Sequence, residues 1–551
     1  MRWNARRGVA RGGHGDRSHP ASAGLQGEET VSPSEPTAER SDVPARTGEV
    51  VHRQQGSLWE LVFSRENLSA ALKRVEANRG AAGVDGMGTE DLRPWLVDHW
   101  PQVREALDAG VYRPLPVRRV AIPKPGGGER LLGVPGVLDR LVQQAVAQVL
   151  GPIFDPHFSG SSFGFRPGRS AHQAVRVARR AIEDGHRWVV DVDLDRFFDR
   201  VQHDALMARV ARRVGDRRVL RLIRRFLEAG IMADGVVWAS EEGTPQGSPL
   251  SPLLSNVMLD DLDRELWQRG HRFVRYADDI RVFVRSRRAA HRVLDSVTAV
   301  VEQRLKLKVN REKSKVVSAS VATLLGFGFY FTRGGVRIRA DPKALKRFKD
   351  RIRELTSRRR SIAMDVRIAA LNRYVTGWMG YFRLADTPRV FRNLDEWFRR
   401  RMRQIRWKEW KRSKARHDNL VRRGINSSQA WEWASSGKGY WRIAASPVLT
   451  RSLPNSYWDK LGLRQLFPTW ERFRSVSQSL PVTPRRRENV RAGCPPTPVS
   501  SWVFEPVDQS GAGARPCKGH ALSLRARRSE FRFPTEAPGH PRCPDGREGR
   551  R

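Results

Sequence analysis

Two apolar runs in this chain carry aspartates at positions where β-strands would bring carboxylates together. In VVDVDLD (189–195), Asp191, Asp193 and Asp195 fall on one face of an extended run, and the apolar residues between them fall on the other. RFVRYADDIRVFVR (272–285) predicts two strands around an acidic turn at Asp278 and Asp279. Taken alone, that turn is most simply an exposed acidic hairpin turn, because Asp is common in turns.

The two acidic runs together favour a metal site over a plain turn. Neighbouring carboxylates repel one another, and a divalent cation between them would offset that repulsion. One aspartate of the first run and the pair in the turn would hold two metal ions about 3.5–4 Å apart, the arrangement used in nucleotidyl transfer. Oxygen-only ligands suit Mg²⁺.

The segments around these runs mix helical and extended patterns. A helix is predicted after a capping Ser64, with an end at the glycine-rich turn that starts at Gly80. Residues 113–135 predict a hairpin around a second glycine-rich turn, and residues 138–154 predict an amphipathic helix. Residues 57–335 therefore predict an α+β region with mostly short antiparallel strands.

The pattern becomes wholly helical after Asp341-Pro342, a favourable N-cap and first-turn pair. Three helical segments with many Lys and Arg follow, and then a short, aromatic and basic region from about 417 to 473. Residues 1–56 and 474–551 are rich in Pro, Gly, Ser and Arg and show no usable periodicity. We expect both to be disordered, and the second to be a non-native extension or a disordered tail.

The charge of the chain predicts a polyanionic partner. Its 551 residues include 101 Lys and Arg against 59 Asp and Glu, a formal net charge of +42. No run approaches the roughly 18 apolar residues of a membrane-spanning helix, so nucleic acid is favoured over a membrane. The only cysteines are Cys494, Cys517 and Cys543, which excludes disulfides and thiolate zinc sites from the body of the chain and fits a reducing cytoplasm or nucleoid.

Six segments, in order, resemble the reverse-transcriptase blocks of group II intron-encoded proteins, most closely those of the bacterial class C branch. Each block alone is a weak signal, but their common order is specific. The resemblance covers about residues 57–473. The blocks are IPKPGGGERLLGVP (122–135), FGFRPGRSAH (163–172), GTPQGSPLSPLLSN (243–256), YADD (276–279), LKLKVNREKS (305–314) and LLGFGF (324–329).

The resemblance implies a right-hand polymerase with additional RNA-binding regions. Residues 57–335 would form the fingers and palm, 336–414 the all-helical domain X that serves as thumb and maturase surface, and 415–473 a small C-terminal DNA- and RNA-binding region. Many relatives append an endonuclease with paired cysteines. This chain lacks such a pair, as class C members do.

The resemblance also assigns roles to individual residues. Asp193, Asp278 and Asp279 match the catalytic metal ligands for two Mg²⁺ ions, and Leu194 is included with them as a metal and nucleotide contact. The other expected nucleotide-binding residues are Lys124, Arg130, Phe198 and Gln246. The reaction implied is attack of a primer 3′-hydroxyl on the α-phosphate of a dNTP opposite an RNA template.

Each nucleotide-binding assignment has a plainer structural interpretation. Phe198 would screen the sugar 2′ position, but it could simply pack in the core, as Phe197 is expected to do. Lys124 and Arg130 would neutralise the triphosphate, but alone they read as a solvated basic turn. Gln246 would lie beside the nascent base pair, although PQG alone is only a turn.

The basic helices are expected to contact RNA. The candidates are Lys343, Lys346, Lys349, Arg351 and Lys438, because Lys and Arg bind phosphates. For the aromatic residues among them, Trp378, Tyr381, Trp397, Trp407 and Trp410, core packing is favoured over stacking on bases.

The function implied is RNA-directed DNA synthesis together with binding of the group II intron RNA, which assists splicing and supports mobility by target-primed reverse transcription. The partners would be intron RNA, RNA template, DNA primer or target, and dNTPs. One alternative is a splicing-only maturase with an idle polymerase. Another is a reverse transcriptase of a retron, diversity-generating element or defence system. Arg281, just after the acidic turn, is more basic than the resemblance leads us to expect there.

Overall fold

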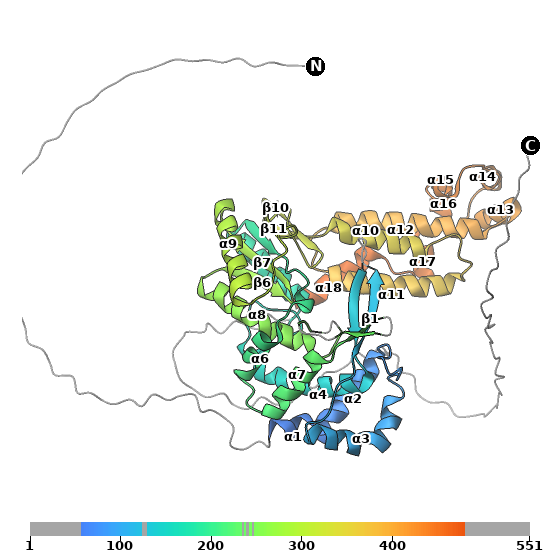
Figure 1. Ribbon diagram of the computed structural model, residues 1–551. Coiled ribbons are helices and arrows are strands. Elements are labelled where there is room, and N and C mark those ends of the chain that lie inside the picture. Colours follow the sequence, from blue (N-terminus) through green and yellow to red (C-terminus); the bar gives the residue numbers. More distant parts are fainter. Residues whose placement is uncertain (1–56, 124–128, 234–235, 239–241, 245–246, 480–551) are drawn as a thin grey trace, which may run out of the picture. The chain divides into compact units, whose positions relative to one another are not determined.

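The computed structural model describes residues 57–123, 129–233, 236–238, 242–244 and 247–479 (Figure 1). The predicted tails at 1–56 and beyond 479 lie outside the described residues. From the start to the acidic turn, the elements are α1 (Leu58–Val62), α2 (Arg65–Asn78), α3 (Leu92–Asp108), β1 (Val117–Pro123), β2 (Glu129–Val134), α4 (Val137–Phe154), η1 (Asp155–His157), α5 (Ala171–Glu183), β3 (Trp188–Val192), η2 (Phe197–Asp199), α6 (His203–Ala211), α7 (Arg217–Glu228), β4 (Ile231–Ala233), β5 (Val236–Trp238), α8 (Ser251–Gln268) and β6 (Arg272–Tyr276).

The remaining described elements change from mixed to helical. They are β7 (Asp279–Val284), α9 (Arg287–Ala299), the π-helical turn η3 (Val300–Arg304), β8 (Lys315–Ser318), β9 (Thr323–Leu324), β10 (Phe327–Thr332), β11 (Gly335–Ala340), α10 (Pro342–Leu355), α11 (Met364–Phe382), α12 (Pro388–Glu409), α13 (Ser413–Val421), α14 (Ser427–Ala434), α15 (Tyr440–Ile443), α16 (Pro447–Ser452), α17 (Asn455–Lys460) and α18 (Leu466–Ser479).

Local capping sets several of these boundaries. The Ser64 hydroxyl accepts a hydrogen bond from the Asn67 amide at 3.3 Å and starts α2. The helix ends before Gly80, because Arg79 already adopts a left-handed conformation with φ 45°. Asp341 caps α10 by accepting from the Lys343 amide at 3.3 Å, with Pro342 in the first turn, as the sequence predicts.

Two sheets carry the acidic runs and the glycine-rich hairpin. The predicted hairpin over 113–135 is β1 and β2, in a sheet ordered β2-β1-β4-β5. β1 also pairs with β4 in a short parallel stretch, whereas the other strand pairings of the described residues are antiparallel, in line with the expectation of mostly antiparallel strands. The acidic runs lie in a second sheet, ordered β6-β7-β3-β8, whose neighbouring strands are all antiparallel.

The register of the second sheet places two basic residues beside one aspartate. Asp191 on β3 lies opposite Arg281 on β7 and opposite Lys315 on β8. Directly opposed residues in antiparallel strands have neighbouring side chains on one face, so unlike charges here attract each other. The strand register therefore places Asp191 beside Arg281, the basic residue that follows the acidic turn.

Both faces of this sheet are buried against different layers. Val190, Val192 and Ile280 point into one core cluster with α4, α8 and α9. Val189, Val274 and Phe283 join a second cluster with α5 and β10–β11. Alternation along β3 puts Asp191 on the second of these faces, with Val189. The carboxylates therefore lie on the face of the sheet that α5 also covers.

The helices after β11 bury a third core of their own. Within it, Asp395 of α12 is 2% exposed and accepts hydrogen bonds from the amides of Leu466 and Phe467 at 2.7 and 2.8 Å, so it satisfies the start of α18. α18 continues to Ser479, which corrects the expected start of an unstructured tail at 474. Arg474 in this helix donates to Asp386 at 2.8 Å, a contact that sequence periodicity does not reveal. No described helix is long and apolar enough to cross a membrane.

Candidate active site

The acidic turn between β6 and β7 has a backbone conformation that its surroundings enforce. Tyr276 pairs with Asp279 across the turn, and Ala277 adopts a φ of 58°, in the left-handed region that non-glycine residues rarely occupy. Gly164 packs directly against it, because a Cβ at that position would lie 2.3 Å from the Ala277 nitrogen. The FGFRPG block therefore touches the YADD block through a contact that only glycine allows.

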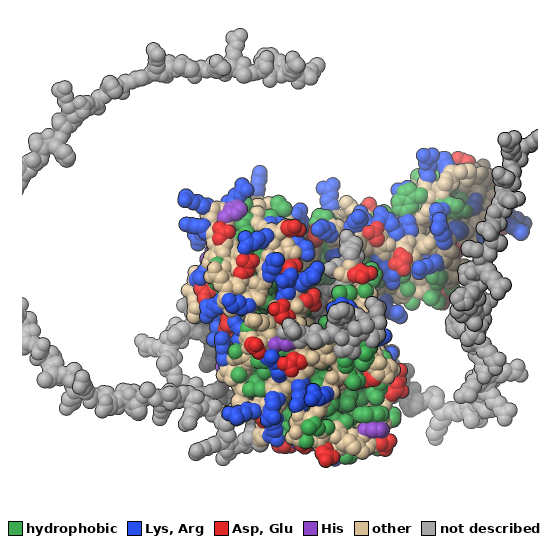
Figure 2. Space-filling model, viewed as in Figure 1, with side chains coloured by type: hydrophobic (Ala, Val, Ile, Leu, Met, Phe, Trp, Pro, Cys, Tyr) green, Lys and Arg blue, Asp and Glu red, His purple; other side chains and the backbone are tan. Residues whose placement is uncertain are grey.

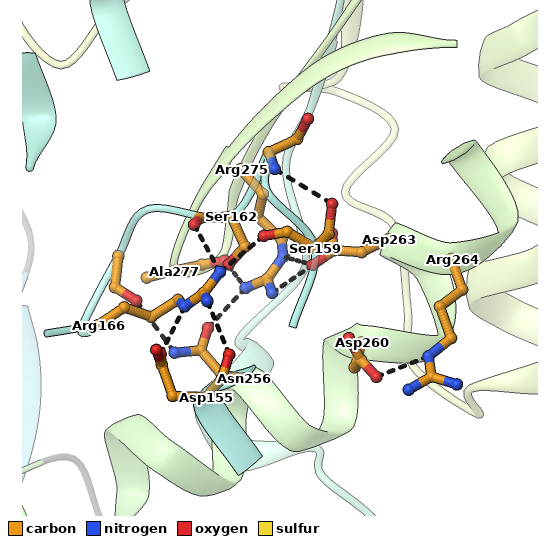
Figure 3. A network of polar contacts seen from close by, with 12 residues as sticks. Asp155, Ser159, Ser162, Arg166, Asn256, Asp260, Asp263, Arg264, Arg275 and Ala277 are labelled. Carbon is orange, nitrogen blue, oxygen red and sulfur yellow. Dashed lines mark hydrogen bonds and ion pairs between the residues drawn. The ribbon is translucent and has the colours of Figure 1, made fainter. Parts of the chain in front are cut away.

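A fully buried ion pair lies beside this turn (Figure 3). Arg275, the residue before Tyr276, and Asp263 of α8 are each 0% exposed, and their side chains meet at 2.6–3.0 Å in a bidentate arrangement. Arg275 also donates to the Asn256 side chain at 2.9 Å and to the Ala277 carbonyl at 3.0 Å. One guanidinium thus joins α8 to the strained residue of the turn.

A second arginine fixes the loop that covers the turn. Arg166 bonds to Asp155 at 2.7 Å and to the carbonyls of Ser159 and Ser162 at 2.6 and 3.0 Å (Figure 3). The loop in turn pairs with β6, because the Ser161 carbonyl accepts from the Arg275 amide at 2.9 Å. Three sequence blocks, at 163–172, 243–256 and 276–279, are brought together in this way.

The first acidic run is held by the block at 305–314. The Asp193 amide donates to the Ser314 hydroxyl at 3.0 Å, and the Asp193 carbonyl accepts from the Asn310 amide at 2.8 Å. Leu194 forms an isolated antiparallel bridge with Val309, and its side chain is 6% exposed. These bonds engage the backbone amide and carbonyl of Asp193 and not its side-chain carboxylate, which can therefore contact a ligand.

The pKa values of Asp193 and Asp279 are both raised, and neighbouring carboxylates contribute to each rise. Burial raises the pKa of Asp193, and the nearby Asp278 and Asp195 raise it further. Burial also raises the pKa of Asp279, with contributions from Asp191, Asp278 and Asp193 that oppose the lowering effect of Arg281. The half-buried carboxylates of Asp193 and Asp279 therefore lie within electrostatic range of Asp278, and we refer to these three residues as the acidic cluster.

Arg281 lies within this cluster. Its guanidinium pairs with Asp191 at 2.7 Å and with Asp279, and its side chain is 12% exposed. Asp191 is therefore an ion-pair partner of Arg281, which is more specific than the general charge tuning or surface role expected for it. Asp195, the third aspartate of the run, instead pairs with Arg200 at 3.1 Å.

The side chains are of the type that binds a hard cation, but their spacing in this structure is not that of a metal site, and Asp279 is shared with Arg281. Among the described residues, no group of three or more His, Cys, Asp or Glu side chains is arranged closely enough to hold a metal ion. The carboxylates present are oxygen donors, the type that Mg²⁺ prefers. Their partial burial and mutual repulsion are the conditions under which a divalent cation is stabilising.

The predicted nucleotide-binding residues are described only in part. Half-buried Phe198 lines a pocket of about 350 Å³ together with Leu131 and Thr244, and its ring stacks edge-on against Phe197 at 5.1 Å. Phe197 is 3% exposed, so it is the core residue of the pair, as expected. Arg130 lies on β2 opposite Ile122, but its side chain, like all of Lys124 and Gln246, lies outside the described residues.

The candidate RNA-binding residues differ in their exposure and in whether they already have a partner within the chain. Lys343, Lys346 and Lys438 are exposed, and Lys438 lies 4.7 Å from the Trp433 ring centroid. Half-buried Lys349 lies 6.0 Å from the Trp397 ring, whereas Arg351 is paired with Glu354. Figure 2 shows Lys and Arg side chains spread over the visible face of the described chain with Asp and Glu among them.

The aromatic residues of the helical region follow the core interpretation. Trp407 and Trp410 are 2% and 7% exposed, and both belong to the third core. Trp378 and Trp397 pack against that core, and only Tyr381 of this group is exposed. Tyr381 donates to the Leu325 carbonyl at 2.8 Å, so its hydroxyl has a structural partner.

Sequence reasoning missed the residues that support the turn. Arg275 is a charged residue that follows two buried apolar residues of β6, and Asp263 is its counterpart inside a helix with a buried face. A charge at a position of core periodicity is a signal for a buried ion pair. Its partner could not be named from sequence, because the pairing depends on how α8 packs against β6.

Comparisons with known proteins identify two segments of the chain. Residues 122–329 match the model of the family described as reverse transcriptase (RNA-dependent DNA polymerase). Residues 345–424 match the family described as the group II intron, maturase-specific domain. The first contains the acidic cluster, and the second contains most of α10–α13.

Individual relatives agree with the family matches. Protein YkfC of Escherichia coli is 34% identical over 299 residues, which cover 47% of this chain and 78% of that protein. The group II intron-encoded protein LtrA of Lactococcus lactis is 33% identical over 268 residues, which cover 47% of this chain and 42% of LtrA. A chain of a partial Cas6-RT-Cas1–Cas2 complex is 27% identical, with coverage of 46% of this chain and 43% of that chain, at a TM-score of 0.30.

Proposed function

Because this chain belongs to the family of reverse transcriptases that carry a group II intron maturase domain, we propose that it copies RNA into DNA at the acidic cluster and binds intron RNA to assist splicing and mobility. The observation that carries the first part is the electrostatic proximity of half-buried Asp193, which follows β3, to half-buried Asp278 and Asp279 in the β6–β7 turn. Residues 57–335 would act as fingers and palm, 336–414 as thumb and maturase surface, and 415–473 as a further nucleic-acid contact.

The chemistry at the cluster is phosphoryl transfer from a dNTP to a primer 3′-hydroxyl. Two Mg²⁺ ions, when bound, would supply the charge that activates the hydroxyl and stabilises the leaving pyrophosphate. The carboxylates of Asp193, Asp278 and Asp279 would hold these ions, with Leu194 beside them. Phe198, which lines the pocket of about 350 Å³, would restrict space at the sugar 2′ position.

The chain's own contribution to this chemistry is to hold a repulsive set of carboxylates in place. Ser314 and Asn310 fix the backbone of Asp193, and Arg275 fixes the carbonyl of Ala277 beside Asp278. A reacting centre that is positioned before substrate arrives avoids the cost of reorganisation during the reaction. These contacts support a working polymerase centre.

The first test replaces one proposed metal ligand. Asp278→Asn preserves size and removes the charge, and we expect primer extension on a poly(rA)–oligo(dT) substrate with Mg²⁺ to fall at least about a hundredfold. The matched control is Asp195→Asn, a neighbouring carboxylate paired with Arg200, which should retain activity within a few-fold.

Two outcomes would contradict this assignment. If wild-type protein incorporates no dNTP under these conditions, the proposed polymerase activity is wrong. If Asp278→Asn and Asp195→Asn lose activity to the same extent, the loss reflects the overall field of the cluster and not a ligand at Asp278.

A splicing factor with an idle polymerase is the second candidate, and one observation favours it. Arg281 pairs with Asp279, so one proposed ligand already has a cationic partner. The maturase-specific match over 345–424 supports either candidate and disfavours a retron, diversity-generating or defence enzyme.

Sequencing of RNA that copurifies with the full chain should return one dominant group II intron, and a mixture without such an intron would contradict the maturase function.

A further inference from the structure

An arginine-lined pocket lies away from the acidic turn, where α5 meets the segment between α11 and α12. Its volume is about 280 Å³. Three of its arginines come from one face of α5, because positions separated by three and four residues are neighbours on a helix. The charged residues that line it are Arg176, Arg179, Arg180, Arg383, Arg474 and Asp386.

The positive charge of this pocket is mostly uncompensated. Asp386, its single acidic lining residue, already accepts from Arg474 at 2.8 Å and from the Ile338 amide at 3.0 Å. Arg179 pairs with Glu183 at 3.3 Å. Among the described residues, no carboxylate forms an ion pair with Arg176, Arg180 or Arg383.

Two further observations favour binding of an anion in this pocket. The Nε atom of Arg383 is buried and has no hydrogen-bond partner in the described chain, whereas the Nε atom of Arg179 lies 3.3 Å from a Glu183 carboxylate oxygen. Burial lowers the pKa of Arg176, and repulsion from Arg383, Arg179 and Arg180 lowers it further. A fold gains nothing from gathering like charges around a hollow unless an anion occupies it, because repulsion and desolvation both oppose the arrangement.

The size and chemistry of the pocket suit phosphate. Ligand pockets for drug-sized molecules start at about 300 Å³, so this pocket of about 280 Å³ is at the small end of that range and has room for a phosphate group. Planar guanidinium groups bind phosphate oxygens through paired hydrogen bonds. The apolar part of the lining is limited to Ile338 and Leu384, too little for a hydrophobic anchor.

We propose that this pocket binds the phosphate backbone of a folded RNA, at a contact separate from the acidic cluster and from the lysines of α10. It is formed by α5 of the sheet region together with Arg383 and α18 of the helical region, so one RNA segment would touch both parts of the chain. The inference rests on the proposed RNA-binding function and specifies a site for it.

The test uses the full chain and a double variant of the two exposed arginines, Arg176→Gln/Arg180→Gln. The probes are a bulged RNA hairpin, a blunt RNA–DNA primer–template duplex and sodium tripolyphosphate. We expect the variant to bind the hairpin at least about tenfold more weakly, with the slope of log affinity against log salt reduced by about two. Arg217→Gln/Arg288→Gln removes the same charge from exposed positions elsewhere and should leave hairpin affinity within about twofold.

A melting experiment separates binding from a merely structural role. Tripolyphosphate should raise the melting temperature of the wild-type chain, because a ligand that binds only the folded state stabilises it. The double variant should melt at a higher temperature than wild type at low salt, since repulsion is relieved, and should respond less to tripolyphosphate. Arg383→Lys keeps the positive charge but loses the paired hydrogen bonds of the guanidinium, so tripolyphosphate should raise its melting temperature by an intermediate amount.

Four results would overturn the proposal. Equal loss of hairpin affinity in the control pair would mean that only net charge matters. Equal loss for the primer–template duplex would place the pocket on the path of the polymerase substrate. A reduced tripolyphosphate response of the double variant with unchanged hairpin affinity would indicate a site for free anions and not for RNA. A double variant that melts below wild type in every buffer would indicate a structural role. Primer extension by the wild-type chain is measured separately, so failure of the polymerase proposal is distinguishable from each of these.

Discussion

Arg281 is the residue that most alters how the acidic cluster works. It lies opposite Asp191 in the strand register and two residues after Asp279 on β7. Its guanidinium therefore forms ion pairs with both carboxylates on the same face of the sheet. It offsets part of the repulsion among four aspartates when no cation is bound. The same contact competes with any metal ion for the Asp279 oxygens.

Arg281→Gln should therefore separate these two effects. Without divalent ions we expect the variant to be less stable by about 1–3 kcal/mol, because two partly buried carboxylates lose a charged partner. Added Mg²⁺ should stabilise the variant more than it stabilises wild type, and primer extension should saturate at a lower Mg²⁺ concentration. Urea unfolding with and without Mg²⁺ measures the first effect, and a Mg²⁺ titration of extension measures the second.

The control for this experiment is Arg285→Gln, an exposed arginine on the same side of the turn in sequence. Its Mg²⁺ response should match that of wild type. An Arg281→Gln protein with the wild-type Mg²⁺ response in both assays would show that Arg281 does not compete for the ligand oxygens.

At the scale of elements, the β6–β7 turn depends on a contact with α8. The buried pair of Arg275 and Asp263 joins the strand to the helix, and a further bond from Arg275 holds the Ala277 carbonyl. Such a pair is strongly destabilising when one partner is removed, because the other charge is left buried and unpaired. The pair therefore determines the geometry of the turn more than it determines the net stability.

A double-mutant cycle tests this division of roles. Arg275→Met alone should cost about 3–5 kcal/mol, whereas Arg275→Met/Asp263→Leu should cost less than the sum of the two single changes. Urea unfolding measures these costs. Primer extension should stay low in the double variant, since the Ala277 carbonyl has lost its donor, and additive stabilities or restored activity would contradict the proposed positioning.

The exposed lysines of helix α10 give a prediction about the salt dependence of RNA binding. Lys343 and Lys346 are exposed and have no acidic partner among the described residues, whereas Arg351 is paired with Glu354. Replacing both lysines with Gln should reduce the salt slope of binding to a bulged RNA hairpin by about 1.4–1.8, from about 0.7–0.9 per phosphate contact. Arg351→Gln should change it less, and an equal change would mean that the ion pair does not compete with RNA.

At the scale of the whole molecule, much of the net charge of +42 has local uses. Some arginines hold carbonyls or carboxylates inside the fold, as Arg166 and Arg275 do. Others, such as Arg176, Arg180 and Arg383 of the arginine-lined pocket, form no ion pair with a carboxylate of the described chain. Net charge alone therefore overstates the surface available to nucleic acid, and the distribution of partners decides which residues are free.

Much of the architecture was predictable because it depends on local patterns. The hairpin at β1–β2, the strands around the acidic turn, the caps at Ser64 and Asp341 and the buried Trp407 all follow from periodicity and turn chemistry. The extension of α18 to Ser479 was not predictable, because its first turn is capped by Asp395 from a distant helix. Contacts of long sequence separation carry no local signal.

The sequence by itself determined the reaction class and the family, because the six blocks and the three aspartates are properties of residue order. Only the tertiary structure decided which charges are neutralised. Strand register paired Asp191 with Arg281, helix packing buried Arg275 against Asp263, and α5 brought its arginines beside Arg383. The reason is that electrostatic interactions depend on distance and burial, and in this chain the partners are separated by 12 to about 200 residues.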